Sequence, residues 1–284
     1  MIQVKDLFFT YPGNTEPTIK NVNVTIPTGE IFGFLGPSGA GKSTLQKILI
    51  GVLKGYQGSV SVLHQDVNKA TTDFYNTLGV AFETPNFYQK FTAKENLQFF
   101  QSFYEKEGES IEKLMEKVGL GDVLETRVSD FSKGMKMRLN VVRAFLHDPE
   151  LIFLDEPTSG LDPLNVQKVR ELIVQMKEAG KTIILNTHNM NVAEILCDRV
   201  AFIVDGEVKL IDSPDHLKNS YSQKEITVVF KEKGIEKQAS FEMKHLGTQL
   251  EFQKILQQDQ LVRINTNEKT LEDIFIEVTG RKLQ

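Results

Sequence analysis

One stretch of the sequence carries the residue types that bind phosphate. It runs Gly36-Pro37-Ser38-Gly39-Ala40-Gly41-Lys42-Ser43-Thr44, between an apolar run ending at Leu35 and a helix-patterned run beginning at Leu45. Glycines let backbone N–H groups turn inward here, and the positive end of the following helix points at the same place. Lys42 then suits the β- and γ-phosphates, and the Ser43 hydroxyl suits Mg²⁺. The pattern predicts a nucleotide triphosphate site; the plainer alternative is a glycine turn before an ordinary helix.

Two carboxylates follow a second apolar run further along the chain. Asp155 and Glu156 come directly after Leu151–Leu154, which is typical of a central parallel strand. Because parallel strands bring their carboxyl ends to one edge of a sheet, we expect these acids beside the phosphate loop. Asp155 would hold Mg²⁺, directly or through water, and Glu156 would polarise a water in line with the γ-phosphate. Two solvated acids at a strand end are the alternative, which the phosphate loop upstream disfavours.

Composition and charge exclude some classes of function. The 284 residues are 40% hydrophobic and 25% charged, which is ordinary for a globular protein, and the net charge is −5. No Lys/Arg cluster supplies the basic face that a nucleic acid partner needs, so we expect none. The single Cys197 fits a reducing compartment or, more simply, a buried apolar position. The N-terminus lacks a signal-peptide pattern and no apolar run approaches the ~20 residues that span a bilayer, so a cytoplasmic protein is expected.

The order of the predicted elements indicates an α/β fold. Strands and helices alternate along most of the chain, which predicts a mostly parallel core sheet covered by helices. Residues 2–9 and 22–26 predict strands of an antiparallel N-terminal β subdomain. A block with helical spacing over about 84–146 interrupts the α/β order and is interpreted as a helical insertion.

The last part of the chain is interpreted as a small α+β accessory domain. The polar, unpatterned stretch Asn219–Lys224 is the predicted linker, which divides the chain into domains over 1–218 and 219–284. Thr270-Leu271-Glu272-Asp273 resembles a capping box that opens a final helix. The other predicted elements of this domain are two strands and one helix, at Ile226–Phe230, Leu261–Ile264 and Leu250–Leu256.

Further motifs of the first domain resemble those of one family. Phe131-Ser132-Lys133-Gly134-Met135, at a helix start, resembles the signature usually written LSGGQ. Ser159-Gly160-Leu161-Asp162 resembles the D-loop, His188 the switch histidine, and Tyr11 the aromatic residue that stacks on adenine. Order and spacing over residues 1 to about 215 resemble those of ABC-transporter ATPases. The resemblance implies a P-loop NTPase fold of ABC type, and the C-terminal part looks like the extension on ATPase subunits of ABC-2-type exporters.

The resemblance also implies an ATP-hydrolysing motor subunit that works as a dimer. A second copy of the chain would pack head to tail, so that Ser132 and Gly134 of one subunit close over the ATP and Mg²⁺ held by the other. His188 would contact the γ-phosphate and Asp162 would couple the two sites. Lys42 and Glu156 would act in catalysis.

A separate transmembrane permease would convert dimer closure into transport, with export as the implied direction. That permease would hold the subunit on the inner face of the cell membrane. Taken singly, each motif residue has a plainer interpretation: Ser132 can cap its own helix, His188 can be a surface residue, and Tyr11 can pack in a turn.

Two departures from the family pattern concern the site. Lys133 replaces the first of the signature's paired glycines and Met135 replaces the glutamine, whereas Ser132 and Gly134 survive, so function is expected to survive. The family's Q-loop glutamine falls on Glu83, which would add a negative charge beside Mg²⁺. A glutamate at this position resembles the ATPase subunits of lantibiotic self-protection exporters.

Three aromatic residues, Phe87, Tyr88 and Phe91, follow the Glu83 loop. In the family this surface receives a helix of the membrane subunit, and core packing of the helical insertion is an equally good interpretation.

A soluble ABC-type ATPase that acts on a macromolecular partner is the alternative function, and a nucleotide-dependent scaffold is a third. DNA-repair versions carry long coiled coils and translation-factor versions carry two cassettes, and this chain has neither feature. The intact Glu156 argues against the scaffold.

Overall fold

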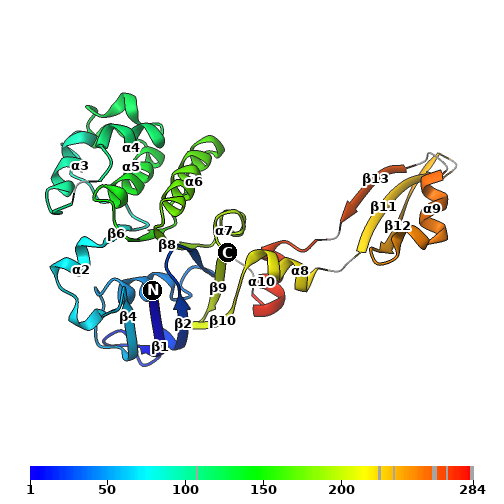
Figure 1. Cartoon of the computed structure of the whole chain (residues 1–284), viewed down its shortest axis with the longest axis horizontal. Helices are drawn as coiled ribbons and strands as arrows, with labels where there is room; N and C mark the ends of the chain where they lie inside the picture. The colour runs from blue at the N-terminus through cyan, green and yellow to red at the C-terminus, as the bar shows by residue number, and fades with distance from the viewer. Residues whose placement is uncertain (107, 223–224, 233, 258–260, 267, 282–284) are drawn as a thin grey trace. The chain divides into compact units, whose positions relative to one another are not determined.

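The computed structural model describes residues 1–106, 108–222, 225–232, 234–257, 261–266 and 268–281 (Figure 1). The chain divides into two units, Met1–Pro214 with the chain end from Arg281, and Asp215–Gly280. The division therefore falls after Pro214 and not after residue 218. The predicted linker begins inside a helix, because α8 spans Pro214–Tyr221, and its last residues, 223–224, lie outside the described residues.

A six-stranded sheet, in the order β10-β9-β3-β8-β7-β6, forms the centre of the first unit. Its strands run parallel except β10, which pairs antiparallel with β9 at one edge. Every residue of β3, β7 and β8 is buried, as expected for parallel strands covered on both faces. This confirms the mostly parallel core sheet. The strands are β3 Ile31–Leu35, β6 Leu78–Ala81, β7 Leu151–Asp155, β8 Thr182–Thr187, β9 Arg199–Val204 and β10 Glu207–Asp212.

A second sheet in this unit is antiparallel, in the order β2-β1-β4-β5. Its strands are β1 Ile2–Phe9, β2 Ile19–Ile26, β4 Gln57–Val62 and β5 Gln65–Asp66. One hydrophobic cluster joins this sheet to β3 and to helix α1 (Lys42–Leu49), which contributes Leu45, Ile48 and Leu49. The helix that follows the phosphate loop is therefore anchored to both sheets.

The helical insertion lies between β6 and β7, as predicted (Figure 1). Its α-helices are α3 Ala93–Gln101, α4 Ile111–Lys117 and α5 Lys133–Phe145. Helix α3 begins with a capping box, in which the Glu95 N–H donates to Thr92 Oγ1 (3.1 Å) and the Thr92 N–H donates to Glu95 Oε2 (2.7 Å). Helix α5 packs on β6, the edge strand of the central sheet. The remaining α-helices of the unit are α2 Thr72–Asn76, α6 Pro163–Glu178 and α7 Met190–Leu196.

The second unit contains an antiparallel sheet in the order β12-β11-β13, with helix α9 (Leu250–Gln257) packed through Phe252 and Ile255. The predicted last helix is confirmed as α10 (Leu271–Thr279), with its capping box at Thr270 and Asp273. The strands are β11 Glu225–Glu232, β12 Ile235–Glu242 and β13 Leu261–Thr266. Strand β12 escaped prediction because Phe241 is its single buried residue, so it carries no apolar alternation.

None of the helices within the described ranges combines the length and the apolar character that crossing a bilayer requires.

Candidate functional site

The phosphate loop connects β3 to α1, and its glycines serve two different needs. Gly39 and Gly41 adopt φ of +79° and +108°, values that favour glycine. At Gly36, an added Cβ would lie 2.1 Å from the carbonyl oxygen of Ile203 on β9. Gly36 therefore permits close packing of the loop on the sheet, whereas Gly39 and Gly41 shape the turn itself.

Lys42, the first residue of α1, lies inside this loop. Its Nζ donates to the carbonyl oxygens of Gly36 (2.6 Å) and Pro37 (3.0 Å). Burial lowers the pKa of the Lys42 ammonium group, and the carboxylates of Glu156, Asp155 and Glu83 oppose that shift. Phosphate oxygens at this point would stabilise the charged ammonium.

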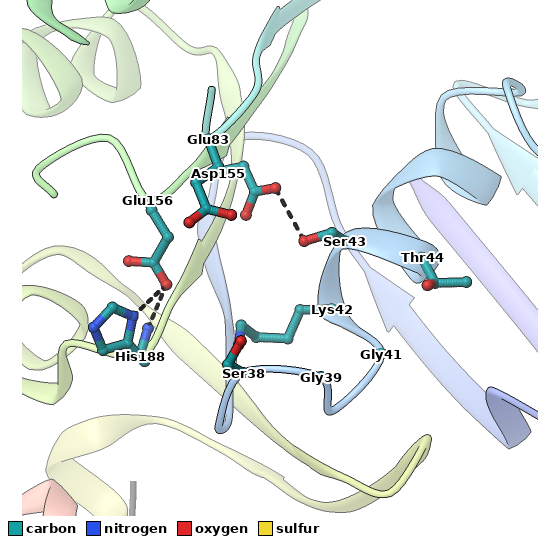
Figure 2. A pocket seen from close by; sticks show the side chains of 10 residues that line it. All are labelled: Ser38, Gly39, Gly41, Lys42, Ser43, Thr44, Glu83, Asp155, Glu156 and His188. Atoms are coloured by element: carbon teal, nitrogen blue, oxygen red, sulfur yellow. Dashed lines mark hydrogen bonds and ion pairs between the residues drawn. The ribbon is translucent and has the colours of Figure 1, made fainter. Parts of the chain in front are cut away.

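A cavity of about 210 Å³ opens beside the loop, and its lining joins residues from four parts of the chain (Figure 2). The lining consists of Ser38, Gly39, Gly41, Lys42, Ser43, Thr44, Glu83, Asp155, Glu156 and His188. The structure thus brings the loop, the acids after β7, the acid after β6 and the histidine after β8 together. They meet because β3, β8, β7 and β6 are parallel neighbours whose carboxyl ends share one edge of the sheet.

Asp155, the last residue of β7, contacts the loop directly. The Ser43 hydroxyl donates to Asp155 Oδ2 at 3.1 Å. Burial raises the pKa of the Asp155 carboxyl group, hydrogen bonds from Ser43 and Asn186 oppose the shift, and the charges of Glu83 and Glu156 add to it. A hydroxyl and a carboxylate oxygen this close together suit a hard cation such as Mg²⁺, which would also relieve the repulsion among the three acids.

Glu156 is fixed by three hydrogen bonds from the end of β8. Its Oε1 accepts from the backbone N–H of His188 (2.8 Å) and contacts His188 Nδ1 (2.7 Å) (Figure 2). Its Oε2 accepts from the Thr187 hydroxyl (3.0 Å). The residue has a φ of +49°, a strained value for glutamate. The backbone conformation directs the Glu156 side chain toward the phosphate loop, and the three donors fix its carboxylate there.

Two polar residues beneath the pocket escaped sequence reasoning. Asn186 Nδ2 donates to Gln46 Oε1, and both side chains are buried, which ties β8 to α1. Thr187, also fully buried, holds Glu156 as described above. The available signal was the run Asn186-Thr187 inside an otherwise apolar strand, because buried polar side chains require partners.

Several predicted site residues do not line this cavity. Gly36 and Ala40 lie in the loop but on its packed side, where the Gly206 N–H donates to the Ala40 carbonyl (3.0 Å). Tyr11 contacts the site indirectly, since its hydroxyl lies 3.2 Å from Thr44 Oγ1 and its ring packs edge-on against Phe9. Tyr11 therefore occupies a position from which either stacking or packing is possible.

The signature and D-loop residues lie at the starts of two neighbouring helices. Ser132 caps α5, its Oγ accepting from the Met135 N–H (3.2 Å), and Asp162 caps α6, accepting from the Asn165 N–H (3.1 Å). A Cβ atom added at Gly134 would lie 3.2 Å from Leu161 Cδ2. These residues form one surface outside the lining of the cavity among the described residues.

The aromatic residues after Glu83 separate into a buried and an exposed group. Phe87 is 6% exposed and contacts the ring of Phe100, so core packing is its role. Tyr88 and Phe91 are 51% and 42% exposed and pack against each other. Only these two remain free to meet a partner on this segment.

Comparisons with known proteins agree with this geometry. Residues 19–159 match the family described as ABC transporter. The fluoroquinolones export ATP-binding protein of Mycobacterium tuberculosis (strain CDC 1551 / Oshkosh) is 45% identical over 284 residues, 100% of this chain and 94% of its own length. The bacitracin transport ATP-binding protein of Bacillus licheniformis is 32% identical over 99% of this chain and 97% of its own. A lantibiotic transport ATP-binding protein of Streptococcus pyogenes is 34% identical over 77% of this chain and 93% of its own.

A solved structure is similar as well. It is described as the dimeric post-hydrolysis state of an ATP-binding cassette bound to ADP and Pi, with a TM-score of 0.67 and 29% identity over 75% of this chain and 98% of that one. Fold, phosphate loop and full-length relatives agree, and the chain belongs to the ABC transporter family as one of its ATP-binding, ATP-hydrolysing subunits.

Proposed function

We propose that the chain is the motor subunit of an exporter, which binds Mg²⁺-ATP in the cavity beside the phosphate loop and drives a separate permease. The observation that carries the proposal is the arrangement of Asp155, Glu156 and His188 around Lys42 and Ser43. Full-length relatives whose names state fluoroquinolones export and bacitracin transport support the exporter assignment.

The phosphates of ATP would lie along the loop at Ser38–Thr44. Lys42 Nζ would exchange the carbonyl oxygens of Gly36 and Pro37 for β- and γ-phosphate oxygens. Burial lowers the pKa of Lys42, and a phosphate anion beside the ammonium group would favour its charged form and raise that pKa. Tyr11 would stack on the adenine, with turn packing as the alternative role.

Ser43, Asp155 and Glu83 would hold Mg²⁺. Among the described residues, no group of three or more His, Cys, Asp or Glu side chains could hold a metal, and Mg²⁺ needs few such ligands because it keeps waters and phosphate oxygens. When bound, Mg²⁺ would neutralise charge on the transferred phosphoryl oxygens.

Glu156 would orient and polarise the water that attacks the γ-phosphorus. Its Oε2 is held by Thr187, whereas its Oε1 is shared by the backbone and ring of His188. If the His188 ring turns to the γ-phosphate, Oε1 is freed on that side to accept the water's hydrogen bond. The water oxygen then bonds to the γ-phosphorus as the bond from that phosphorus to the bridging oxygen breaks. The proton of the water passes to Glu156 and from there to the released phosphate, and ADP and phosphate leave.

A second copy of the chain would complete each site, with Ser132 and Gly134 covering the γ-phosphate and Asp162 linking the two sites. The exposed start of α5 supports this, because its N–H groups and the Ser132 hydroxyl form a ready anion site. The dimeric state of the similar cassette supports it too.

The permease would hold this subunit on the cytoplasmic face of the cell membrane. The soluble alternative is not favoured, because the relatives that span the whole chain carry export and transport names.

The test is to express the tagged chain in its native cell, solubilise membranes in mild detergent and identify what co-purifies. A stoichiometric polytopic protein supports the motor-subunit proposal. A soluble dimer with no membrane partner, even for Glu156→Gln held in ATP, overturns it.

A further inference from the structure

Four polar side chains, here called the polar ring, join helix α1 to the central sheet beside the ATP cavity. Helix α1 contributes Ser43 and Gln46, which are three residues apart and therefore share one face of the helix. The sheet contributes Asp155 of β7 and Asn186 of β8, which are paired residues of neighbouring parallel strands. Gln46 and Asn186 lie outside the lining of the cavity, whereas Ser43 and Asp155 belong to it.

Hydrogen bonds run from each member of the polar ring to the next. The Ser43 hydroxyl donates to Asp155 Oδ2 (3.1 Å), as Figure 2 shows. Asn186 donates to the same carboxylate from the other strand, and its Nδ2 also donates to Gln46 Oε1. A side-chain amide nitrogen carries two hydrogens, so this one nitrogen serves both acceptors. Asp155 is therefore held by two donors, one from the helix and one from the neighbouring strand.

Gln46 and Asn186 are 1% and 0% exposed, and each leaves one polar atom unpaired. Gln46 Nε2 and Asn186 Oδ1 have no hydrogen-bond partner among the residues that the structure describes. A buried polar atom without a partner lowers the stability of the fold, and two apolar side chains of similar shape would anchor α1 to β8 without that loss. The bonds that are made lead to Asp155, which favours a role at the site over anchoring alone.

We propose that Asn186 and Gln46 are positioning residues for Mg²⁺: Asn186 orients the Asp155 carboxylate, and Gln46 orients the Asn186 amide. Because Gln46 Oε1 accepts from the nitrogen of that amide, the nitrogen and not the oxygen faces Asp155. Removing a group that orients a metal ligand in this way typically lowers metal affinity by about 10–100-fold. The inference rests on the proposed function and adds two residues that act on the metal through its ligand.

The main chain of Asn186 has a separate role, which a side-chain substitution leaves in place. Its carbonyl oxygen accepts from the Glu156 N–H (2.9 Å), and the next residue, Thr187, holds the Glu156 carboxylate. Metal binding can therefore be altered at the Asn186 side chain while the carboxylate that acts on water keeps its own bonds.

The test uses Mn²⁺, which suits the same oxygen ligands as Mg²⁺ and is visible by EPR. Binding of Mn²⁺ with a non-hydrolysable ATP analogue to the purified full chain is followed from the spectrum of the bound metal, and binding of the analogue alone is measured in EDTA. Asn186→Leu should weaken the metal-dependent binding by at least about tenfold and leave binding in EDTA within about twofold of wild type. Unchanged Mn²⁺ binding, or an equal loss in EDTA, overturns the inference in favour of simple anchoring.

Gln46→Met removes the acceptor for Asn186 and keeps the length of the side chain. It should weaken Mn²⁺ binding by at least about twofold, and it should add nothing further in the double variant with Asn186→Leu, because Gln46 acts through Asn186. This variant tests the inference even if Asn186→Leu does not fold. No change in Gln46→Met, or effects that multiply in the double variant, overturns the inference.

Two control variants separate this inference from a general loss of packing and from the proposed function. Asn96 is as buried as Asn186 but bonds only backbone groups, so Asn96→Leu should lower the urea midpoint of unfolding without changing Mn²⁺ binding. Weakened Mn²⁺ binding in Asn96→Leu overturns the inference. Asp155→Asn should lose the metal, and wild-type Mn²⁺ binding by this variant overturns the proposed Mg²⁺ site itself. If Asp155→Asn loses the metal and Asn186→Leu keeps it, the motor function stands and only the positioning role is wrong.

Discussion

At the scale of single residues, Glu156 combines a strained backbone with a fully engaged carboxylate. Its φ of +49° costs about 1–3 kcal/mol in general, and the donors at Thr187 and His188 hold the side chain in place. The strained backbone of Glu156 is explained if it serves to direct the carboxylate toward the phosphate loop. The bond between Asp155 and Ser43 places Asp155 beside the hydroxyl that would hold Mg²⁺, so Asp155 suits the metal and Glu156 is the carboxylate that suits the attacking water.

Glu156→Gln should lower kcat for ATP hydrolysis by about 10²–10⁴-fold while ATP binding persists. A glutamine oxygen can still accept from the His188 N–H, but the amide cannot take a proton from water. Phosphate release and equilibrium binding of a fluorescent ATP analogue, measured on one preparation, check this. A kcat within about tenfold of wild type would assign the base to another group.

Glu83→Gln should keep substantial ATPase activity. The Glu83 charge contributes to the raised pKa of Asp155, so its removal relieves repulsion and also weakens the hold on Mg²⁺. We expect half-maximal activity at up to about tenfold higher Mg²⁺, measured by titrating Mg²⁺ at fixed ATP, with the exposed Glu125→Gln as control. Complete loss of activity would make Glu83 essential to the chemistry.

At the scale of elements, polar side chains join the helical insertion to the sheet and to its own aromatic segment. His147, just after α5, reaches β6 through Nε2 and the Leu78 carbonyl oxygen (3.0 Å) and stacks on Tyr104 at 3.5 Å. Asn96 of α3 accepts from the Tyr88 N–H (2.9 Å) and donates to the Tyr88 carbonyl (3.0 Å). The insertion is therefore positioned by specific bonds as well as by apolar packing.

The His147 contact should make stability depend on pH. Burial lowers the pKa of His147 to about 4 from 6.5, so the unfolded chain binds a proton that the native state refuses between these values. Its contribution is present above pH 6.5 and is lost as pH falls toward 4, by on the order of 3 kcal/mol. Urea unfolding of wild type and His147→Gln at pH 7 and pH 5 measures this. An equal pH dependence in both proteins would contradict the assignment.

Asn96→Ala should destabilise the aromatic segment. It leaves the N–H and C=O of Tyr88 without their partner, at a cost of about 3 kcal/mol in the free energy of unfolding. The exposed Gln98→Ala on the same helix is the control and should change stability by less than about 0.5 kcal/mol. Denaturant unfolding compares the two, and equal midpoints would show that Asn96 is dispensable.

At the scale of the whole molecule, the sequence predicted those functional features that short, continuous stretches of the chain encode. The phosphate loop, the acids after β7 and the capping box at Thr270 are local signals, and the parallel sheet explains why the first two meet. The sequence did not predict which distant side chains meet or which neighbouring side chains are buried. Gln46 pairs with Asn186, and Phe87 is buried while Tyr88 is exposed. Strand β12 was not predicted because it is stabilised by pairing with β11 and has no apolar pattern of its own.

The head-to-tail dimer is the largest-scale expectation, and mixing two inactive variants tests it. Lys42→Ala damages the site of its own subunit. Ser132→Asp keeps the cap of α5, because aspartate is a good N-cap, but sets a negative charge against the partner's γ-phosphate; the neutral Ser132→Asn is its control. In a mixed dimer both defects fall on one site and the other site is intact. If subunits exchange freely and sites act independently, an equal mixture should therefore regain about a quarter of wild-type ATPase activity, because half of the dimers are mixed and each holds one good site. If Ser132 acted within its own chain, every subunit in the mixture would be defective and activity would stay at the level of the separate variants.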